Sequence, residues 1–275
     1  MASTLTATEK IKAPIRQELD ALETELGRVI ASPIGLVSAL GKHLTATRGK
    51  RLRPALLLLA ARLGRPDTDA AIKAACAIEL VHTATLLHDD SIDRSYLRRG
   101  LPTVNKLWND QVSVIMGDYL FCKAFRILHE SGMPEIAAVL AAGSDSMTSG
   151  EMLQMDSRGR FDITEEAYLG MIELKTASLF VTSCEAGAIL GGLSESQRRN
   201  LALYGRHIGM AFQVVDDILD FVGEVDVIGK PVGNDLKDGR VTLPLIAALR
   251  NALDPSPEPV ASWDFDHTVA FIKDH

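Results

Sequence analysis

Apolar residues recur along most of this chain at the three- and four-residue spacing of amphipathic helices. In residues 8–30, one helical face would carry Ile11, Ile15, Leu19, Leu22 and Leu26. No segment of useful length alternates apolar and polar residues in the manner of a β-strand. The pattern therefore predicts an all-α protein.

Start and stop signals divide this pattern into successive helices. Gly132 and Pro134 separate two long helices. The segment "GGLSESQ", residues 191–197, ends one helix at its glycines and begins the next at Ser194, with Gln197 in the position of a capping box. The expected helices are 8–30, 55–63, 69–95, 103–130, 134–157, 164–190 and 195–222.

The remaining segments look irregular. The stretch "GKPVGNDLKDGR", residues 229–240, is polar and rich in glycine, which predicts a loop rather than a helix. Residues 253–264 form a proline-rich surface connection, and the sequence ends inside a new periodic segment, 265–275. Because no linker is evident, residues 1–275 are expected to form a single domain.

Composition narrows the class of protein. The sequence is 47% hydrophobic but only 5% aromatic, which is typical of packed helices, and its net charge of -7 argues against nucleic-acid binding. The longest apolar run, Ala55–Ala61, is too short to span a membrane, and no secretory signal is visible. Three isolated cysteines, Cys76, Cys122 and Cys184, are expected to be buried free thiols. We therefore expect a cytoplasmic protein without a transmembrane segment.

Two clusters of aspartates share one spacing. They are "DDSID", with Asp89, Asp90 and Asp93, and "DDILD", with Asp216, Asp217 and Asp220. The first and last acids of each cluster fall on one helical face, where they repel each other unless a cation lies among them. Paired carboxylates favour Mg²⁺, with ligand phosphates completing the shell. One such cluster could equally be a solvated helix end, but two identical clusters favour a metal-binding function.

Basic residues suited to a phosphorylated ligand lie in several places. The segment "RGKRLRP", residues 48–54, places three cations just before a predicted helix, whose N-terminus attracts anions. Any one of these side chains could be an ordinary surface charge, whereas the whole set indicates an anion site. The candidates are Lys50, Arg51, Arg53, Arg98, Arg99, Lys175 and Lys230. His82 and Gln213 precede the two aspartate clusters on the same helical faces, although His82 could equally be a core histidine.

These motifs together resemble the trans-isoprenyl diphosphate synthases of the polyprenyl synthetase family. The similarity covers roughly residues 40–250 and follows the family's order. Its parts are "GKRLRP", "LLHDDSIDRSYLRRGLPT", "MGDYL", "KTA", "FQVVDDILD" and "GKPVGNDLKDGRVTLPL". The resemblance implies an all-α bundle around a deep cavity, with the two aspartate motifs facing each other at its mouth.

The resemblance also implies a role for each motif residue. Two or three Mg²⁺ ions would be held by Asp89, Asp93 and Asp216, with support from Asp90, Asp217 and Asp220. The diphosphate of an allylic substrate would contact Arg98, Lys175 and Lys230. The diphosphate of isopentenyl diphosphate would contact Lys50, Arg53, His82 and Arg99. Thr176 and Gln213 would lie beside the reacting carbons. Because water would quench a carbocation formed there, we expect the loop of residues 223–240 to act as a lid.

Product length in this family depends on residues before the first aspartate motif. Here these are Val81, Ala84 and Thr85, none of which is aromatic, and the motif has no insertion. We therefore expect a medium- to long-chain product, longer than farnesyl. The alternative is a short-chain product of the geranylgeranyl or farnesyl type, with Met116 or Tyr119 closing the pocket.

Three other functions remain open at this stage. The His88–Asp89 pair is compatible with an HD-type metal phosphohydrolase, and the first motif with a class I terpene cyclase. Family members usually continue for several helices beyond the point where this sequence stops, His275, which implies a C-terminally short chain. A non-catalytic or partner-dependent subunit of a hetero-oligomeric prenyltransferase is therefore the third alternative, although homodimers are usual for the family.

Overall fold

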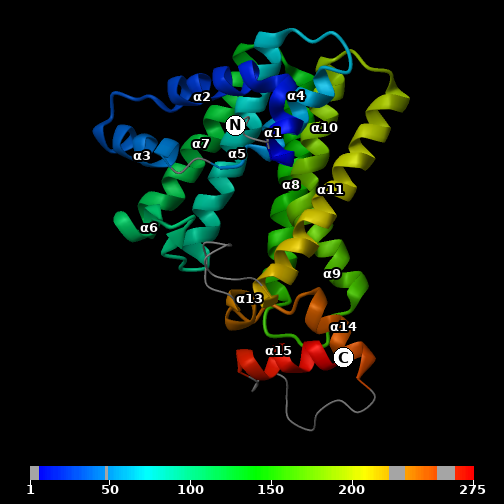
Figure 1. Cartoon of the computed structure of the whole chain (residues 1–275). Helices are drawn as coiled ribbons and strands as arrows, with labels where there is room; N and C mark the ends of the chain where they lie inside the picture. Colours follow the sequence, from blue (N-terminus) through cyan, green and yellow to red (C-terminus); the bar gives the residue numbers. More distant parts are fainter. Residues whose placement is uncertain (1–5, 47–48, 223–232, 253–263) are drawn as a thin grey trace, which may run out of the picture. The chain divides into compact units, whose positions relative to one another are not determined.

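The computed structural model describes residues 6–46, 49–222, 233–252 and 264–275. Within these residues the protein is almost entirely helical, which confirms the predicted all-α class (Figure 1). The chain divides into two compact units, each described separately below. Unit 1 comprises Met1–Ser144 and Leu179–Gly205, and unit 2 comprises Asp145–Ser178 and Arg206–His275. The expectation of a single domain stays a prediction.

Unit 1 is built around α5, Thr68–Ile92, which is apolar on most of its sides and therefore buried. It packs along α7, Asp110–Glu130 (Figure 1), and against α4, Leu52–Ala61, and α2, Arg16–Ile30. By length and composition α5 could cross a membrane, but 61% of its apolar window is buried inside the protein, as in a core helix.

The N-terminal helix expected at 8–30 is divided into three pieces. They are α1, Ala7–Lys12; the 3₁₀ turn η1, Ala13–Ile15; and α2. Pro14 explains the interruption, since its ring removes a backbone N–H donor. Because of this break, the apolar face does not continue through α1, and Ile11 is 60% exposed while Ile15 is fully buried. The placement of Ile11 on a buried face was therefore wrong.

Several further boundaries differ from the sequence-based expectation. Helices α3, Gly35–Ala46, and α14, Leu243–Asn251, were not predicted. The segment 103–130 is interrupted between α6, Val104–Leu107, and α7, because the Asn109 side chain caps α7 by accepting from Val112 N–H at 2.8 Å. The expectation of buried cysteines was correct for Cys76 and Cys184 but wrong for Cys122, which is exposed.

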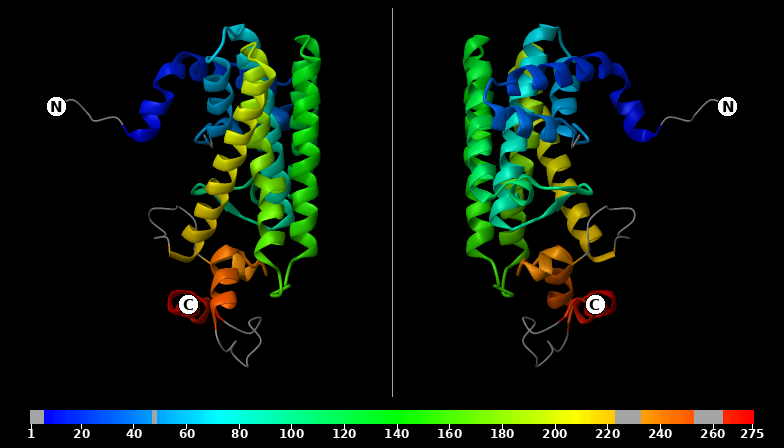
Figure 2. Two further views of the ribbon diagram at one scale, coloured as in Figure 1. Left: turned by 90° about the vertical axis from the view of Figure 1, so that its right-hand side faces the viewer. Right: turned by 90° about the vertical axis from the view of Figure 1, so that its left-hand side faces the viewer.

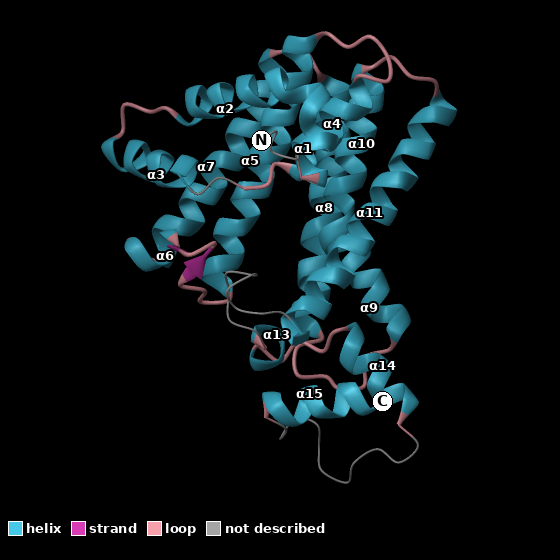
Figure 3. Cartoon of the chain, in the orientation of Figure 1, coloured by secondary structure: helices cyan, strands magenta, loops and turns pink. Residues whose placement is uncertain are grey.

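The described residues also contain one short hairpin that the strand analysis missed (Figure 3). Its strands, β1, Leu97–Arg98, and β2, Leu101–Pro102, are too brief to show an alternating pattern. The turn residues Arg99 and Gly100 both have positive φ, 54° and 76°, as a type I′ turn requires. Glycine adopts that conformation freely, whereas for arginine it is strained.

Unit 2 contains parts of two long helices, α8, Pro134–Asp156, and α11, Glu195–Val222, together with the C-terminal helices. As predicted, α11 begins with a capping box, in which Ser194 and Gln197 exchange hydrogen bonds. The helix expected at 164–190 is continuous but changes its winding: α9, Glu165–Ile172, passes through the π-helical turn η2, Glu173–Ala177, into α10, Ser178–Leu190. Such π turns are frequent at functional sites.

The core of unit 2 forms where α14 meets α9 and α15, Phe265–Asp274. Its buried residues are Tyr168, Met171, Ile172, Val241, Leu245 and Ile246. The predicted loop at 229–240 contains a one-turn helix, α13, Asn234–Lys237, so the expectation of an entirely irregular segment was wrong there. Residues 223–232, with Lys230, and residues 253–263 lie outside the described part of the chain.

Candidate active site

The first aspartate motif occupies the C-terminal end of α5. Asp89 lies in the last turn, and Asp93 caps the helix by donating its backbone N–H to the Asp89 carbonyl at 2.8 Å. The negative end of the helix dipole falls at this end, so carboxylates here are electrostatically unfavourable without a cation. The two residues are therefore one turn apart in a position that favours binding of a positive ion.

Asp90, between them, has a different environment. Its side chain is buried and accepts hydrogen bonds from Arg98, with Nη2 at 2.8 Å and Nε at 3.0 Å. Burial raises the pKa of Asp90, and the Arg98 guanidinium opposes that shift. The Asp90 carbonyl also accepts from Asn105 Nδ2 at 2.9 Å. In this structure Asp90 and Arg98 therefore bind each other and tie the hairpin to the end of α5.

The strained turn of the hairpin brings Arg99 to the loop before α4. A Cβ atom placed on Gly49 would lie 2.8 Å from Arg99 Nη1, so the guanidinium packs against glycine where a larger residue would clash. Gly49 and Lys50 are consecutive, which places Arg99 beside the "GKRLRP" segment. An unfavourable backbone conformation that is kept at such a position points to a functional role.

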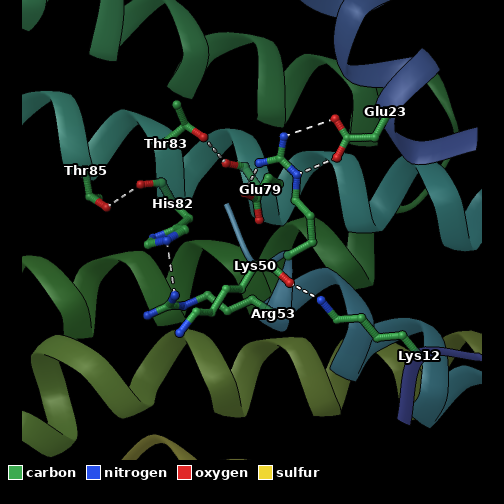
Figure 4. A network of polar contacts seen from close by, with 9 residues as sticks. Lys12, Glu23, Lys50, Arg53, Glu79, His82, Thr83 and Thr85 are labelled. Carbon is green, nitrogen blue, oxygen red and sulfur yellow. Dashed lines mark hydrogen bonds and ion pairs between the residues drawn. The ribbon is translucent and has the colours of Figure 1, made fainter. Parts of the chain in front are cut away.

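Arg53 and His82 meet in unit 1 (Figure 4). Arg53 Nη1 lies 3.2 Å from His82 Nε2, and the guanidinium lies 4.5 Å from the centre of the Phe180 ring. Burial lowers the pKa of Arg53 to about 10, so it remains a cation at neutral pH. Arg53 Nε is buried and makes no hydrogen bond to the residues that the structure describes, which is costly and leaves a donor for a ligand.

His82 is neutral in this environment. Burial lowers its pKa well below the usual value, and the charges of Arg53 and Arg99 lower it further. Because a guanidinium can only donate, His82 Nε2 accepts from Arg53 and the ring proton resides on Nδ1. The structure thus brings together four predicted anion ligands: Lys50 from the loop before α4, Arg53 from α4, His82 from α5 and Arg99 from the hairpin turn.

A small cavity lies next to these groups in unit 1. Its volume is about 60 Å³, and its lining includes Arg51, Glu79, Asp90, Arg98 and Arg99. That volume holds about two water molecules. The cavity therefore connects polar side chains but does not accommodate an isoprenoid chain.

The second aspartate motif lies on α11 in unit 2. Asp217 is 2% exposed and accepts from the Tyr168 hydroxyl at 2.5 Å and from Gln213 Nε2 at 2.7 Å. Burial raises the pKa of Asp217 to about 6, although both hydrogen bonds oppose the shift. Asp220 is 1% exposed; its Oδ2 accepts from Asp235 N–H at 3.1 Å, while Oδ1 has no partner among the described residues.

The "KTA" segment forms the π turn η2. The Thr176 hydroxyl donates to Gln213 Oε1 at 2.7 Å, which completes a chain of hydrogen bonds through Asp217 to Tyr168. Lys175 Nζ donates to Gln154 Oε1 at 2.5 Å and pairs with Glu151, both on α8. Within unit 2, these contacts connect the predicted residues Thr176, Gln213 and Asp217, whereas Lys175 is bound to α8.

The three residues predicted to set the product length differ in burial. Val81 and Ala84 are fully buried, whereas Thr85 is half-buried and donates to the His82 carbonyl at 2.8 Å. Within the described ranges, no group of three or more acidic, histidine or cysteine side chains gathers in a metal-binding arrangement. Whether the two aspartate motifs face each other stays a prediction.

Two supporting residues were missed by the sequence analysis. Glu79 is 4% exposed inside the most apolar helix, and the signal for it was a lone acid in the run "AACAIELV". Tyr168, which is fully buried, gave no comparable signal, because a tyrosine in an apolar helical pattern is ordinary. Both residues hold side chains that the sequence analysis had singled out.

Comparison with known proteins agrees with these features. The sequence pattern of the polyprenyl synthetase family matches residues 35–259. The chain is 41% identical over 244 residues to an all-trans-nonaprenyl-diphosphate synthase from Rhodobacter capsulatus, covering 88% of this chain and 75% of that protein. It is 36% identical over 243 residues to the octaprenyl diphosphate synthase of Escherichia coli, covering 88% and 75%.

Solved structures give the same result. A polyprenyl synthase from Caulobacter crescentus, in complex with calcium and isoprenyl diphosphate, matches with a TM-score of 0.89 and 33% identity, covering 99% of this chain and 86% of that one. A decaprenyl diphosphate synthase from Rhodobacter capsulatus matches with a TM-score of 0.88 and 34% identity, covering 98% and 86%. The phosphohydrolase and terpene-cyclase alternatives are set aside. The chain belongs to the polyprenyl synthetase family, and it is a trans-prenyltransferase.

Proposed function

We propose that this prenyltransferase condenses isopentenyl diphosphate with an allylic diphosphate, head to tail, to give a polyprenyl diphosphate longer than farnesyl. The observation that carries the proposal is the convergence of four anion-binding side chains beside the first aspartate motif: Lys50, Arg53, His82 and Arg99. Arginines and a lysine next to a helix N-terminus are well suited to a diphosphate.

The diphosphate of isopentenyl diphosphate is assigned to this set of four residues. Arg53 has a buried N–H without a partner in the described part of the chain, and His82 keeps one N–H on Nδ1, so both can donate to phosphate oxygens. Arg99 and Lys50 add positive charge from the hairpin turn and the loop. This site requires no metal ion, because its ligands are cations and N–H donors.

The allylic diphosphate is assigned to Mg²⁺ together with Arg98, Lys175 and Lys230. The donor set fits the ion: Mg²⁺ takes one or two carboxylates and completes its shell with water and phosphate oxygens. Asp89, Asp93 and Asp216 are the proposed ligands, whereas Asp90 and Asp217 are engaged by Arg98 and by Tyr168 with Gln213. When bound, the ions neutralise the negative charge that develops on the departing diphosphate.

The chain's own polar groups act on the reacting carbons. The allylic carbon–oxygen bond breaks, the double bond of isopentenyl diphosphate forms the new carbon–carbon bond, and a proton leaves to the released diphosphate. Because the Thr176 hydroxyl donates to Gln213 Oε1, its oxygen lone pairs remain available to stabilise an electron-deficient carbon. Asp217 fixes the Gln213 amide in the required orientation.

Product length and assembly are proposed at a coarser level. Small residues at Val81, Ala84 and Thr85 support a medium- to long-chain product, as do the nonaprenyl and octaprenyl synthases among the relatives. We propose a cytoplasmic homodimer. A partner-dependent form is the second candidate, because a relative from Geobacillus stearothermophilus with 41% identity is a heptaprenyl diphosphate synthase component 2.

The test is a product assay with the purified chain. It is incubated with Mg²⁺, farnesyl diphosphate and labelled isopentenyl diphosphate, and the dephosphorylated products are separated by length. We expect elongated products that disappear in Asp89→Ala and with excess EDTA. A folded protein that incorporates no label alone, but does so with a partner subunit, would favour the second candidate.

A further inference from the structure

Arg51 stands in a strained backbone conformation between two proposed diphosphate ligands, Lys50 and Arg53. The φ of Arg51 is 47°, in the left-handed region that residues other than glycine rarely adopt. Arg51 occupies the N-cap position of α4. Its side chain makes no capping hydrogen bond. The conformation must therefore be maintained by contacts made elsewhere.

Those contacts are with two carboxylates on two other helices, Glu23 and Glu79, which are labelled in Figure 4. Arg51 Nε and Nη2 donate to the two oxygens of Glu23 on α2, at 2.6 and 3.2 Å. Arg51 Nη1 donates to Glu79 Oε1 on α5 at 2.5 Å. One guanidinium thus connects the loop before α4 to both neighbouring helices.

Glu79 is the unusual member of this triad. It is 4% exposed in an apolar helix, where burial raises its pKa and Arg51 opposes the shift. It lies three residues before His82, so the two side chains leave adjacent turns of α5. Its negative charge repels any anion bound nearby, so electrostatic attraction of a ligand does not explain its presence.

We propose that Arg51, Glu23 and Glu79 form a positioning triad for the isopentenyl diphosphate site. By holding the left-handed turn, the triad fixes the directions in which Lys50 and Arg53 leave the chain relative to His82. None of the three residues needs to touch the ligand. This inference rests on the proposed function of that site and adds the residues that shape it.

Positioning and simple charge predict opposite changes in anion affinity for one substitution, Glu79→Gln. Glu79→Gln removes a negative charge and keeps the shape, so electrostatics alone predicts tighter binding of an anion. Positioning predicts weaker binding, by about tenfold, because the turn relaxes and the ligands diverge. Arg51→Lys keeps the charge but lacks the planar guanidinium that binds both oxygens of Glu23 and also reaches Glu79, and we expect a similar loss.

The measurement is calorimetric titration of inorganic pyrophosphate into the full chain in EDTA, which leaves only the metal-free site. Lys50→Ala is the positive control for loss of a ligand. Glu185→Gln is the matched negative control: Glu185 pairs with Arg198, which also bridges two carboxylates, the second being Glu135. That control is expected to lower Tm without changing the affinity for pyrophosphate. Circular dichroism verifies that each variant is folded, and Glu23→Gln replaces any that is not.

The outcomes keep this inference separate from the proposed function. Unchanged or tighter pyrophosphate binding by Glu79→Gln and Arg51→Lys would overturn the triad, as would a wild-type chain that binds no pyrophosphate in EDTA. If the variants bind pyrophosphate more weakly but the wild-type chain elongates no substrate, the positioning triad is supported and the proposed condensation reaction is rejected. In an active chain, we expect KM for isopentenyl diphosphate to rise about tenfold, with KM for the allylic substrate unchanged.

Discussion

His82 couples a proton to folding through its neighbours. The unfolded chain protonates this histidine near a pKa of about 6.5, whereas burial, Arg53 and Arg99 keep it neutral in the folded protein. The unfolded state therefore binds the additional proton as the pH falls, and His82 makes the free energy of unfolding decrease below about pH 6.5.

We predict that His82→Asn reduces this acid sensitivity. Between about pH 7.5 and pH 5.5, the wild-type chain should lose about 1 kcal/mol more of its free energy of unfolding than the variant. The raised pKa of Asp217, about 6, acts in the opposite direction in both proteins, so the difference between them is the informative quantity. Urea unfolding at both pH values measures it; parallel pH profiles would contradict the prediction.

Tyr168→Phe tests the hydrogen-bond chain in unit 2. The substitution removes a 2.5 Å hydrogen bond to a buried carboxylate, Asp217, and leaves the aromatic ring in the core. We expect a loss of about 1.5–3 kcal/mol of stability. We also expect a lower kcat, because Asp217 then holds Gln213 and Thr176 less firmly. Thermal unfolding measures the loss of stability, and steady-state kinetics measure kcat. An unchanged kcat would show that Tyr168 does not contribute to catalysis.

At the scale of elements, the approach of α8 to the π turn η2 determines where Lys175 and Thr176 lie. In unit 2 the second half of α8 runs alongside α9 and η2 (Figure 2). A Cβ atom added to Gly150 would come 2.3 Å from the backbone nitrogen of Lys175. Because that contact is with backbone, rotation of a side chain cannot relieve it. Glycine at 150 therefore permits the close packing of these two elements.

We predict that Gly150→Ala destabilises the protein by about 1–3 kcal/mol and lowers activity. Gly170→Ala is the matched control on α9, where, apart from the adjoining helix backbone and chain neighbours, no atom of the described residues lies within 4 Å of the added methyl group. The control should be neutral or more stable by about 0.5 kcal/mol, since alanine favours helix over glycine. Thermal unfolding compares the two variants; equal effects would mean that the contact at Gly150 is not limiting.

At the scale of the whole molecule, product length depends on how much space the fold leaves for the growing chain. Thr85 is half-buried one turn before Asp89, whereas Val81 and Ala84 are fully buried. Of the three predicted residues, Thr85 therefore leaves its side chain in the most accessible position. The Thr85 hydroxyl also donates a hydrogen bond to the His82 carbonyl oxygen, at 2.8 Å.

We predict that Thr85→Phe shortens the product, whereas Thr85→Val, which keeps the bulk and removes the hydroxyl, does not. The added ring occupies space that an extended isoprenoid would need, while the first condensation steps remain possible. The products of both variants are separated by chain length after each has consumed the same amount of isopentenyl diphosphate, and their lengths are compared. Products of unchanged length from Thr85→Phe would place the floor of the pocket elsewhere.

The candidate site could be proposed from the sequence because its signals lie within short segments of the chain. Two aspartate triplets of equal spacing, basic residues before a helix and the order of the motifs are features of the sequence alone. The helical class and most long helices followed from periodicity, since burial of one face imposes a repeat of about 3.6 residues. The capping box at Ser194 was equally local and was confirmed.

What only the tertiary structure decided depends on contacts between distant residues. The strained turn at Arg51, the burial of Glu79 and the link from Tyr168 to Thr176 each need partners from other helices. No local pattern predicts these contacts. The apolar periodicity of a helix shows which face is buried, but it does not show which distant residue a side chain on that face contacts. The sequence by itself therefore identified the family and proposed the site residues, and the packing of helices determined which other residues hold those side chains in place.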